Sequence, residues 1–495
     1  MHVKNRFFVF LLSISVSFPL MAQFTKGMNY SVETGINFSG GEHTPLWLTA
    51  NKQGLSSIEK NNGYLRAGIF RPLEDDKHFS YGFGIDLAGA YHFTSSFIVQ
   101  QAYFDLKYRC LGLSVGSKEY GSELKNQLLT SGGMTYSGNA RPIPQVRIGI
   151  PEYTLIPGTK GLFRIKGHLS YGMFTDDNWQ EDFVTLGNKY TEHVLYHSKA
   201  LFVKLGDYKK FPLVFEGGIE MQAQFGGNAF NVDYNYTGIK GNVDMPNTIK
   251  DFFKVLIPSG GDSSTPIGEQ ANVYGNHVGS WNFSLGYQLE DWNARVYYEH
   301  FFEDASQMWG EYGWKDCLAG VEITFPKNRF ISSFVYEYIG TKDQSGPIFH
   351  DKTPEIPDQV SAVDEYYNHY IYTGWQHWGM GIGNPLIVAP LYNNGDIRFM
   401  SNRIKGHHVG FMGQPMVDLG YRVLFSYTKN WGGYKEPFSE VKDNINGLLE
   451  VTYKPHQLKT WDFVASLAFD AGDLLGKSAG GMITVRKTGL LTKSK

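Results

Sequence analysis

Hydrophobic and polar residues alternate along most of the chain, in segments of about ten residues. The segment 213–225 shows the pattern most clearly, because one of its faces carries Leu213, Phe215, Gly217, Ile219, Met221, Ala223 and Phe225. The other face carries Glu216, Glu220, Gln222 and Gln224. Successive side chains of a β-strand point to opposite faces. The pattern therefore predicts a strand with one side toward lipid and the other toward a wet lumen.

About eighteen segments of this kind follow one another, an even number, as bacterial single-chain barrels require. They are 28–39, 63–71, 79–92, 96–108, 110–117, 145–150, 161–173, 199–206, 212–225, 279–289, 294–302, 317–326, 330–339, 406–413, 418–430, 447–454, 461–470 and 479–488. The fold class that we predict is all-β: a transmembrane antiparallel β-barrel of about 18 strands, with a few short helices in long loops or plugging the lumen.

The connections between these segments alternate in length from residue 161 onward. The long ones are 174–198, 226–278, 303–316, 340–405 and 431–446, and the short ones are 207–211, 290–293, 327–329, 414–417 and 455–460. Outer-membrane barrels have short periplasmic turns and longer outside loops. The same alternation, extended backward, places 40–62 and 118–144 outside and both termini in the periplasm.

Two stretches within the long loops have helical spacing. In 246–257, Ile249, Phe252, Phe253 and Leu256 follow it, and Pro246 is well placed near a helix start. In 359–372, Val360, Val363, Tyr366, Tyr367 and Tyr370 form a similar stripe. Such helices indicate either a folded cap or plug, or small loop helices that pack on themselves, and the sequence leaves both open.

The N-terminus indicates export. Lys4 and Arg6 precede an apolar run over 7–18, and Leu20-Met21-Ala22 resembles a cleavage site. We predict a signal peptide at 1–22 and a barrel with loop helices at 23–495, located in the outer membrane. The 35 Phe, 31 Tyr and 10 Trp would supply the aromatic girdles of such a barrel. A soluble sandwich or propeller also alternates, but no repeat of about 40–50 residues is visible.

Charge and cysteine content narrow the possible partners. The net charge of −3 comes with no basic stripe, so we do not expect nucleic acid as a partner. Cys110 and Cys317 are the only cysteines. Whether they pair is left open, and two small apolar residues near strand ends are the favoured interpretation.

We find no group that supports catalysis, a metal or a cofactor. Gly261-Asp262-Ser263-Ser264 resembles a lipase nucleophile motif, but no helix signal follows it. His193 and His197 have helical chelate spacing without further ligands. His407 and His408 would point to opposite faces of a strand. Glu216 and Glu220 lie about 13 Å apart on one strand, too far to act together. We therefore expect that the protein is not an enzyme.

Aromatic residues and arginines gather in two outside loops. Aromatic rings suit the apolar faces of sugars, and guanidinium groups suit carboxylates or phosphates. The candidate polysaccharide-binding residues are Trp309, Tyr312, Trp314, Trp375, His377, Trp378, Tyr392, Arg398 and Arg403. An acidic or neutral surface glycan would fit them. The alternative is that they belong to an aromatic girdle or a loop core.

Several motifs together resemble the capsule assembly protein Wzi family, in the form found among Bacteroides-type bacteria. They cover most of the mature chain and are Ser137-Gly138-Asn139-Ala140-Arg141-Pro142-Ile143-Pro144-Gln145-Val146-Arg147, Tyr196-His197-Ser198-Lys199, His300-Phe301-Phe302-Glu303-Asp304, Tyr336-Glu337-Tyr338, Gln344-Ser345-Gly346-Pro347, Tyr366-Tyr367-Asn368-His369, Gly374-Trp375, Asn402-Arg403-Ile404 and Thr428-Lys429-Asn430-Trp431-Gly432. The resemblance implies a barrel with helical elements obstructing the lumen. Gln307 and Cys317 depart from the pattern, since a glycine is expected at each.

Three functions from different classes follow. The resemblance implies a lectin that binds and helps assemble or anchor capsular polysaccharide, with outer-membrane lipid around it. Whether capsule export machinery docks from the periplasm is left open. The alternative is a diffusion porin for sugars or other small solutes, since eighteen strands enclose a wide lumen. An outer-membrane hydrolase is the third, and it would need a nucleophile or acid pair near the outer rim.

Overall fold

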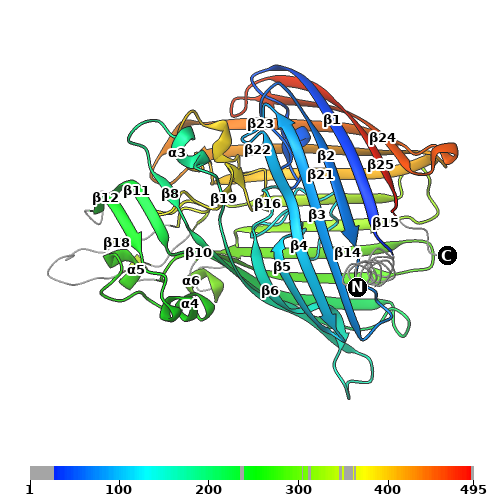
Figure 1. Cartoon of the computed structure of the whole chain (residues 1–495), viewed down its shortest axis with the longest axis horizontal. Coiled ribbons are helices and arrows are strands. Elements are labelled where there is room, and N and C mark those ends of the chain that lie inside the picture. Colours follow the sequence, from blue (N-terminus) through cyan, green and yellow to red (C-terminus); the bar gives the residue numbers. More distant parts are fainter. Residues whose placement is uncertain are drawn as a thin grey trace, which may run out of the picture.

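The computed structural model describes residues 27–234, 239–271, 273–303, 305–309, 314–344, 348–349, 360–361 and 364–491. The predicted signal peptide lies outside these residues. Eighteen antiparallel strands form one closed barrel (Figure 1), as the sequence predicted. Closure is made where β1 pairs with β2 on one side and with β25 on the other, the latter from Asn29↔Leu490 to Gly41↔Ser478.

The barrel strands lie close to the predicted segments. They are β1 (Asn29–Gly41), β2 (Asn61–Arg71), β3 (Phe79–Tyr91), β4 (Phe97–Tyr108), β5 (Leu111–Ser117), β6 (Gln145–Leu155), β7 (Phe163–Met173), β9 (Leu195–Leu205), β10 (Leu213–Phe225), β13 (Asn276–Gln288), β14 (Asn293–Phe302), β15 (Cys317–Thr324), β16 (Ser333–Gly340), β21 (Ile404–Met416), β22 (Leu419–Gly432), β23 (Pro437–Tyr453), β24 (Trp461–Gly472) and β25 (Ser478–Leu490). Each strand pairs with its neighbours in the chain.

The period-two pattern separates the two faces of the wall. On β10, Leu213 and Phe215 are exposed on the outer face, whereas Glu220, Gln222 and Gln224 are buried on the lumen side. Leu201 on β9 and Leu285 on β13 continue the exposed outer band. An apolar exterior and a polar interior are the arrangement that a bilayer requires of a closed barrel.

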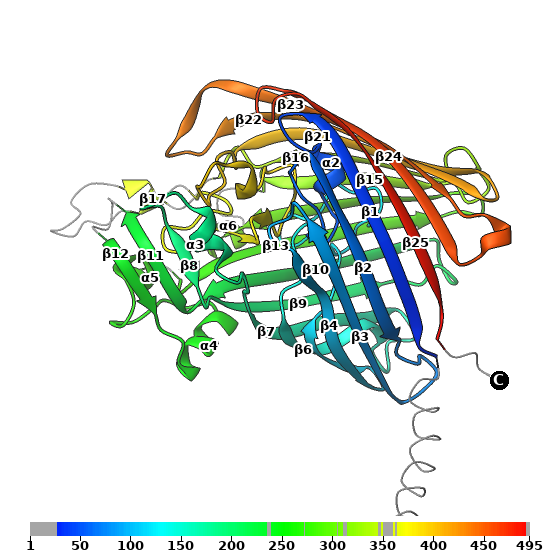
Figure 2. The ribbon, with the colours of Figure 1, turned by 45° about the horizontal axis from the view of Figure 1, so that its top comes forward.

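Smaller elements gather at the end of the barrel opposite the chain termini (Figure 2). The strands among them are β8 (Tyr190–Glu192), β11 (Gly227–Tyr234), β12 (Ile239–Met245), β17 (Ile348–Phe349), β18 (Val360–Ser361), β19 (Gln376–His377) and β20 (Met380–Gly381). The helices there are α3 (Trp179–Phe183), α4 (Ile249–Leu256), α5 (Ile267–Ala271), α6 (Ala305–Met308) and η1 (Pro390–Tyr392), whereas α2 (Leu46–Thr49) lies inside the barrel and η2 (His456–Leu458) lies in a periplasmic turn. In the described part of the chain, no helix is both long and apolar enough to cross a membrane.

The helix expected in 246–257 is confirmed as α4, which begins after a capping box of Thr248 and Asp251. The prediction of a helix in 359–372 is wrong for the described residues, because 364–372 form turns and bends. There Tyr366 and Tyr367 point to different partners, and Tyr367 has a φ of 68°, which a helix does not allow. Residues 362–363 of that segment lie outside the described residues.

The long loop expected at 431–446 is also wrong. The strands β22 and β23 extend into this range and pair as far as Gly432↔Pro437, with a register shift between Asn430 and Gly432. Only a short turn at 433–436 joins them. The two cysteines are not paired: Cys110 is exposed and Cys317 is buried.

Candidate functional site: a polar cavity above a plugged lumen

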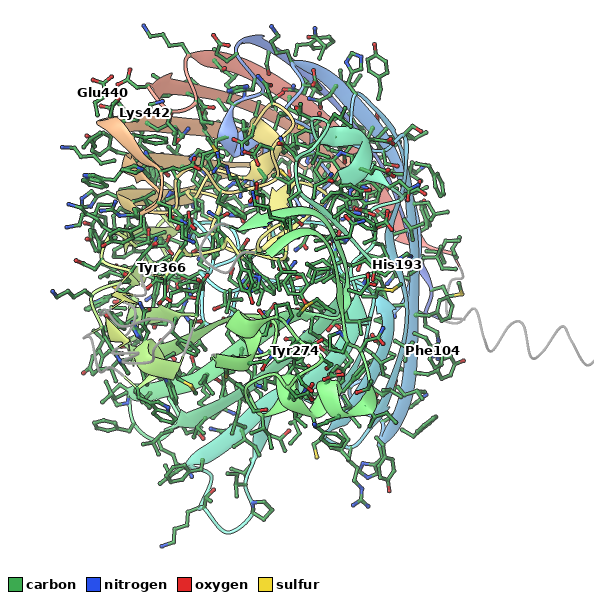
Figure 3. The ribbon with its side chains drawn as sticks, turned by 90° about the vertical axis from the view of Figure 1, so that its left-hand side faces the viewer. Phe104, His193, Tyr274, Tyr366, Glu440 and Lys442 are labelled. Carbon is green, nitrogen blue, oxygen red and sulfur yellow. The ribbon has the colours of Figure 1, made fainter. Side chains whose placement is uncertain are left out.

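Segments of three outside connections fold back into the lumen. They include α2, the stretch 129–143, and the stretch 375–399, and they share one apolar core with lumen-facing wall residues such as Val278 and Leu424. Figure 3 views this end of the molecule and shows the segments crossing the mouth of the barrel. The lumen is therefore plugged by the chain's own loops, mostly in irregular conformation.

Two buried glutamates of the wall hold the plug. Glu337 of β16 accepts hydrogen bonds from Thr130 Oγ1 at 2.5 Å, from Ser131 N at 2.7 Å and from Ser131 Oγ at 2.6 Å. Glu299 of β14 accepts from Met134 N at 2.8 Å and pairs with Lys125 at 2.5 Å. Charge-assisted bonds of this length are among the strongest that a protein makes. They tie the plug to the wall at points far apart in the sequence.

Aromatic side chains fix the plug segments to each other. Trp375 is fully buried, and its indole Nε1 donates to Thr135 O at 2.8 Å. Tyr367 donates its hydroxyl hydrogen to Met134 O. The wall approaches closely at Gly410, where an added Cβ would lie 2.5 Å from Leu129 O. The plug is therefore packed as a protein core rather than as a loose loop.

Above the plug, at the outer end, lies a cavity of about 550 Å³. Its lining comes from the connections after β7, β10, β14, β16 and β22 and includes Lys189, Asp233, Glu269, Glu303, Asp364, Glu365, Asn368, His369, Tyr370, Asp396, Arg398, Lys435 and Glu436. Seven carboxylates face three cationic side chains in this lining. A cavity built by loops on a rigid barrel is where a binding site is expected.

A hydrogen-bonded group forms one wall of the cavity. Glu269 is buried and accepts hydrogen bonds from Gly275 N at 2.5 Å and from Tyr370 Oη at 2.9 Å. Burial raises the pKa of Glu269 to about 7. His369 Nε2 lies 3.5 Å from the same carboxylate, while His369 Nδ1 accepts from the backbone N–H of Ile371. Burial also lowers the pKa of His369 well below its usual value, so the ring is a neutral donor.

The cationic side chains of the cavity are partly engaged. Lys189 Nζ donates to His369 O at 2.6 Å, and removal from water lowers the pKa of Lys189 to about 7. Arg398 lies between Asp396 and Glu436, at 2.7 Å from each. Lys435 pairs with Glu365 at 3.3 Å. With Arg398 and Lys435 paired to carboxylates and Lys189 bound to a backbone carbonyl, the cavity has a negative field and many polar oxygens.

Of the predicted sugar-binding residues, Arg398 lines this cavity. Trp375, His377, Trp378 and Tyr392 belong to the plug below it. His377 Nδ1 bonds to Arg141 O at 2.9 Å, Trp378 lies under the Arg141 guanidinium at 4.1 Å, and Tyr392 bonds to Thr49. These four residues therefore belong to a packed loop core. A loop core was one of the alternatives to sugar binding in the sequence analysis.

The remaining candidates lie elsewhere. Trp314 stacks on the outer face of the wall, 4.9 Å from the ring of His300 and 5.8 Å from that of Phe283. Trp309 is exposed beside Trp281 on the same face, a position that fits an aromatic girdle. Tyr312 lies outside the described residues. Arg403 stacks on Tyr434 at 3.9 Å and is not part of the cavity lining.

Sequence reasoning missed Lys189, Glu269, His369 and Lys435. His369 could have been predicted, because it is the last residue of the motif Tyr366-Tyr367-Asn368-His369. The others carry no local signal, since each is a single polar residue in a different loop.

Two smaller cavities lie in the lumen. One of about 420 Å³ extends from Leu73 and Pro151 near the periplasmic turns to Tyr136 and Tyr196 of the plug region. The other, of about 260 Å³, is lined by Lys52, Arg66, Glu450 and Arg486 among others. The plug thus leaves polar space on the lumen wall.

The described residues contain no group of three or more potential ligands that would hold a metal ion. Asp262 of the lipase-like motif pairs with Lys250 and Lys254 at 2.9 Å each, and it accepts from Ser264 Oγ at 2.5 Å. These contacts give Asp262 a structural role at α4.

Comparisons with known proteins show the fold. No family model matches the chain, and no curated protein matches it. Among solved structures, Escherichia coli Wzi, described as an outer-membrane protein involved in group 1 capsule assembly and a carbohydrate-binding β-barrel, is similar over 96% of this chain and 87% of its own, with a TM-score of 0.55 and 12% identity. Pseudomonas aeruginosa OccD3 is similar over 94% and 92%, with a TM-score of 0.45 and 9% identity. The chain is therefore an outer-membrane barrel in its fold.

Proposed function

We propose that this protein is a non-enzymatic lectin of the outer membrane that binds a surface polysaccharide and helps assemble or anchor a capsule. The observation that carries the proposal is the polar cavity of about 550 Å³ at the outer end, closed below by the plug. A blind cavity that faces outward suits the holding of a chain segment better than passage through the wall. The likeness of the fold to that of Wzi and the motifs that resemble its family support the same function.

The lining favours one class of glycan. Six carboxylates besides Glu269, which keeps its proton up to about pH 7, outnumber the three cations, so the lining repels an acidic polymer. Carboxylate and amide oxygens accept hydrogen bonds from sugar hydroxyls and amino groups. Tyr370 adds an aromatic edge with a polar tip. We therefore propose a neutral or amino-sugar-containing polysaccharide as the ligand.

The test is calorimetric titration of the folded barrel with oligosaccharides cut from the cognate capsule. Arg398→Gln should weaken binding about tenfold, because it removes a charged donor from the lining. Arg403→Gln is the matched control and should bind as the unchanged protein does, since Arg403 lies outside the cavity. Absence of binding, together with unchanged capsule retention in a deletion strain, would reject the lectin.

A diffusion porin remains the second candidate, favoured by the polar lumen cavities of about 420 and 260 Å³. Planar-bilayer recordings separate the two functions. The lectin should be nearly silent, whereas a steady large conductance would support the porin.

A further inference from the structure

Helix α4 and its C-terminal cap turn two charged residues toward the protein and a row of apolar residues outward, while Lys250 stays exposed at the edge of that row. Asp251 and Lys254 are buried and pair at 2.8 Å, and Lys254 also contacts Asp262 at 2.9 Å. Ile249, Phe253 and Ile257, spaced four residues apart, are 80%, 62% and 72% exposed. A helix at a water-facing surface has the opposite arrangement. The outward face of α4 is therefore suited to an apolar surrounding.

The helix lies against the outer face of the barrel wall. Tyr171 of β7 donates its hydroxyl hydrogen to Phe252 O at 2.8 Å, and the Phe252 ring lies 5.1 Å from that of Phe225 on β10. Tyr171 pairs with His197 in the sheet, and Phe225 belongs to the same outward-facing row as Leu213 and Phe215. Figure 1 shows α4 beside the loop end of the wall and not across its mouth.

Below α4 the wall carries a cation that would otherwise face lipid. Lys199 lies in the outward row of β9 with Leu201 and Leu205, and its Nζ donates to Val255 O at 3.0 Å and to Leu256 O at 2.6 Å. The last carbonyls of α4 thus accept hydrogen bonds from the Lys199 ammonium group, which in turn stabilises the C-terminus of the helix. An uncovered ammonium group on the lipid face would be costly.

The position of Lys199 sets the level of the helix. Lys199 lies six residues from Leu205 at the periplasmic end, which is about 20 Å along a strand and about 15 Å across the membrane at a tilt of about 40°. The apolar band of such barrels is about 25 Å tall. Helix α4 therefore lies at the height of the outer leaflet and continues the exposed apolar band of Leu201 and Phe215.

We propose that α4 is an interfacial helix, whose Ile249–Phe253–Ile257 face enters the acyl-chain region of the outer leaflet. The helix would extend the lipid contact of the wall sideways and seat the loop that carries Glu269 on the membrane surface. The occupant of this face is lipid, not a second protein, because the face continues the lipid-facing band of the wall. Lys199, the cation at that level, is covered by the helix, and Lys250 lies at the edge of the face and pairs with Asp262.

The test is spin-label accessibility of the full-length barrel, with Cys110 and Cys317 replaced by Ser, in phosphatidylcholine vesicles. Labels are placed at Phe253→Cys and Ile257→Cys. Leu201→Cys is the reference within the lipid-facing band, and Leu186→Cys is the reference in water, because Leu186 is fully exposed at a loop tip. We expect an oxygen-to-nickel-chelate accessibility ratio at 253 and 257 close to that at 201 and about fivefold above that at 186.

Lys250→Cys is the control on the same helix, since Lys250 lies at the edge of the apolar face and pairs with Asp262. Its ratio should lie between those of the two references. Ratios at 253 and 257 equal to that at 186 would overturn the proposal and would leave the face open to a protein partner. Glycan binding in the outer cavity is a separate measurement, so the outcome does not depend on the lectin proposal.

Discussion

At the scale of single residues, the plug depends on buried carboxylates of the wall, and the sequence of the loops does not predict that they bind these carboxylates. Glu337 is fully buried and takes four hydrogen bonds, from Thr130, from the amide and hydroxyl of Ser131, and from Tyr297. A carboxylate with this number of donors is stable without water. The position of Glu337 on the lumen side of a strand follows from alternation. Three of its four hydrogen bonds, however, come from Thr130 and Ser131, in a loop about 200 residues away in the chain.

Removal of this carboxylate should loosen the plug locally. In Glu337→Ala the donors of Thr130 and Ser131 lose their acceptor in a dry site, so the free energy of local opening should fall by about 3 kcal/mol. Hydrogen exchange of the Ser131 amide measures that free energy directly. Glu440→Ala, at an exposed carboxylate of β23, should leave the Ser131 rate unchanged. Equal rates in both variants would mean that Glu337 does not hold the plug.

The outer cavity should loosen as pH rises. Because the pKa of Glu269 is raised to about 7 from an ordinary value of 4.5, the folded state retains a proton that the unfolded state has released. The stabilisation is complete below pH 4.5 and is lost as pH approaches 7, by at most about 1.4 kcal/mol per pH unit. Exchange of the Gly275 amide, corrected for its intrinsic rate, should show this slope as the difference between the unchanged protein and Glu269→Gln. The difference is needed because the lowered pKa of His369 contributes a slope of opposite sign below pH 6.5 in both proteins. Equal pH profiles of the two proteins would assign the effect to another group.

At the scale of elements, the strands were predictable because each carries its own signal. The lipid and the lumen impose opposite polarities on neighbouring residues, so a period of two appears in every strand. Helix α4 was predictable for a similar reason, since its stripe and capping residues are local. The prediction of a helix failed at 364–372 because the tyrosines there are buried by separate partners. Tyr366 contacts Asp316, and Tyr367 contacts Met134.

A charge on the lipid-facing side should test the assignment of the wall's faces. Leu201 is 54% exposed in the outer row of β9, so Leu201→Arg should lower the free energy of unfolding in phospholipid vesicles by about 2–4 kcal/mol. Denaturant titration followed by tryptophan fluorescence measures the difference. Leu186→Arg makes the same change at an exposed loop tip and should cost almost nothing. A similar loss in both variants would argue against lipid at Leu201.

At the scale of the whole molecule, alternation predicts a cylinder but not what fills it. The loop 118–144 enters the lumen, whereas α4 in the connection after β10 lies on the outer wall, although both follow a strand of the same polarity pattern. Their courses are decided by contacts such as Thr130 with Glu337 and Val255 with Lys199, which join distant parts of the chain. For the same reason Arg398 could be proposed from composition, while Lys189 and Glu269 could not.

Replacement of the plugging loop should convert the barrel into a channel. Gly116 and Gln145 face each other in register, so a linker of about four Gly and Ser residues can replace 118–144 and keep β5 paired with β6. The lumen of an eighteen-stranded barrel would then lose its central segment, and planar bilayers should show a steady conductance that the unchanged protein lacks.

The matched control is the same replacement of 226–275, where Gln224 pairs with Asn276. That loop lies over and outside the wall, so the control should stay closed. If the barrel without 118–144 does not conduct, the other inserted segments suffice to close the lumen. If the control conducts, the outer loops and not 118–144 close the barrel.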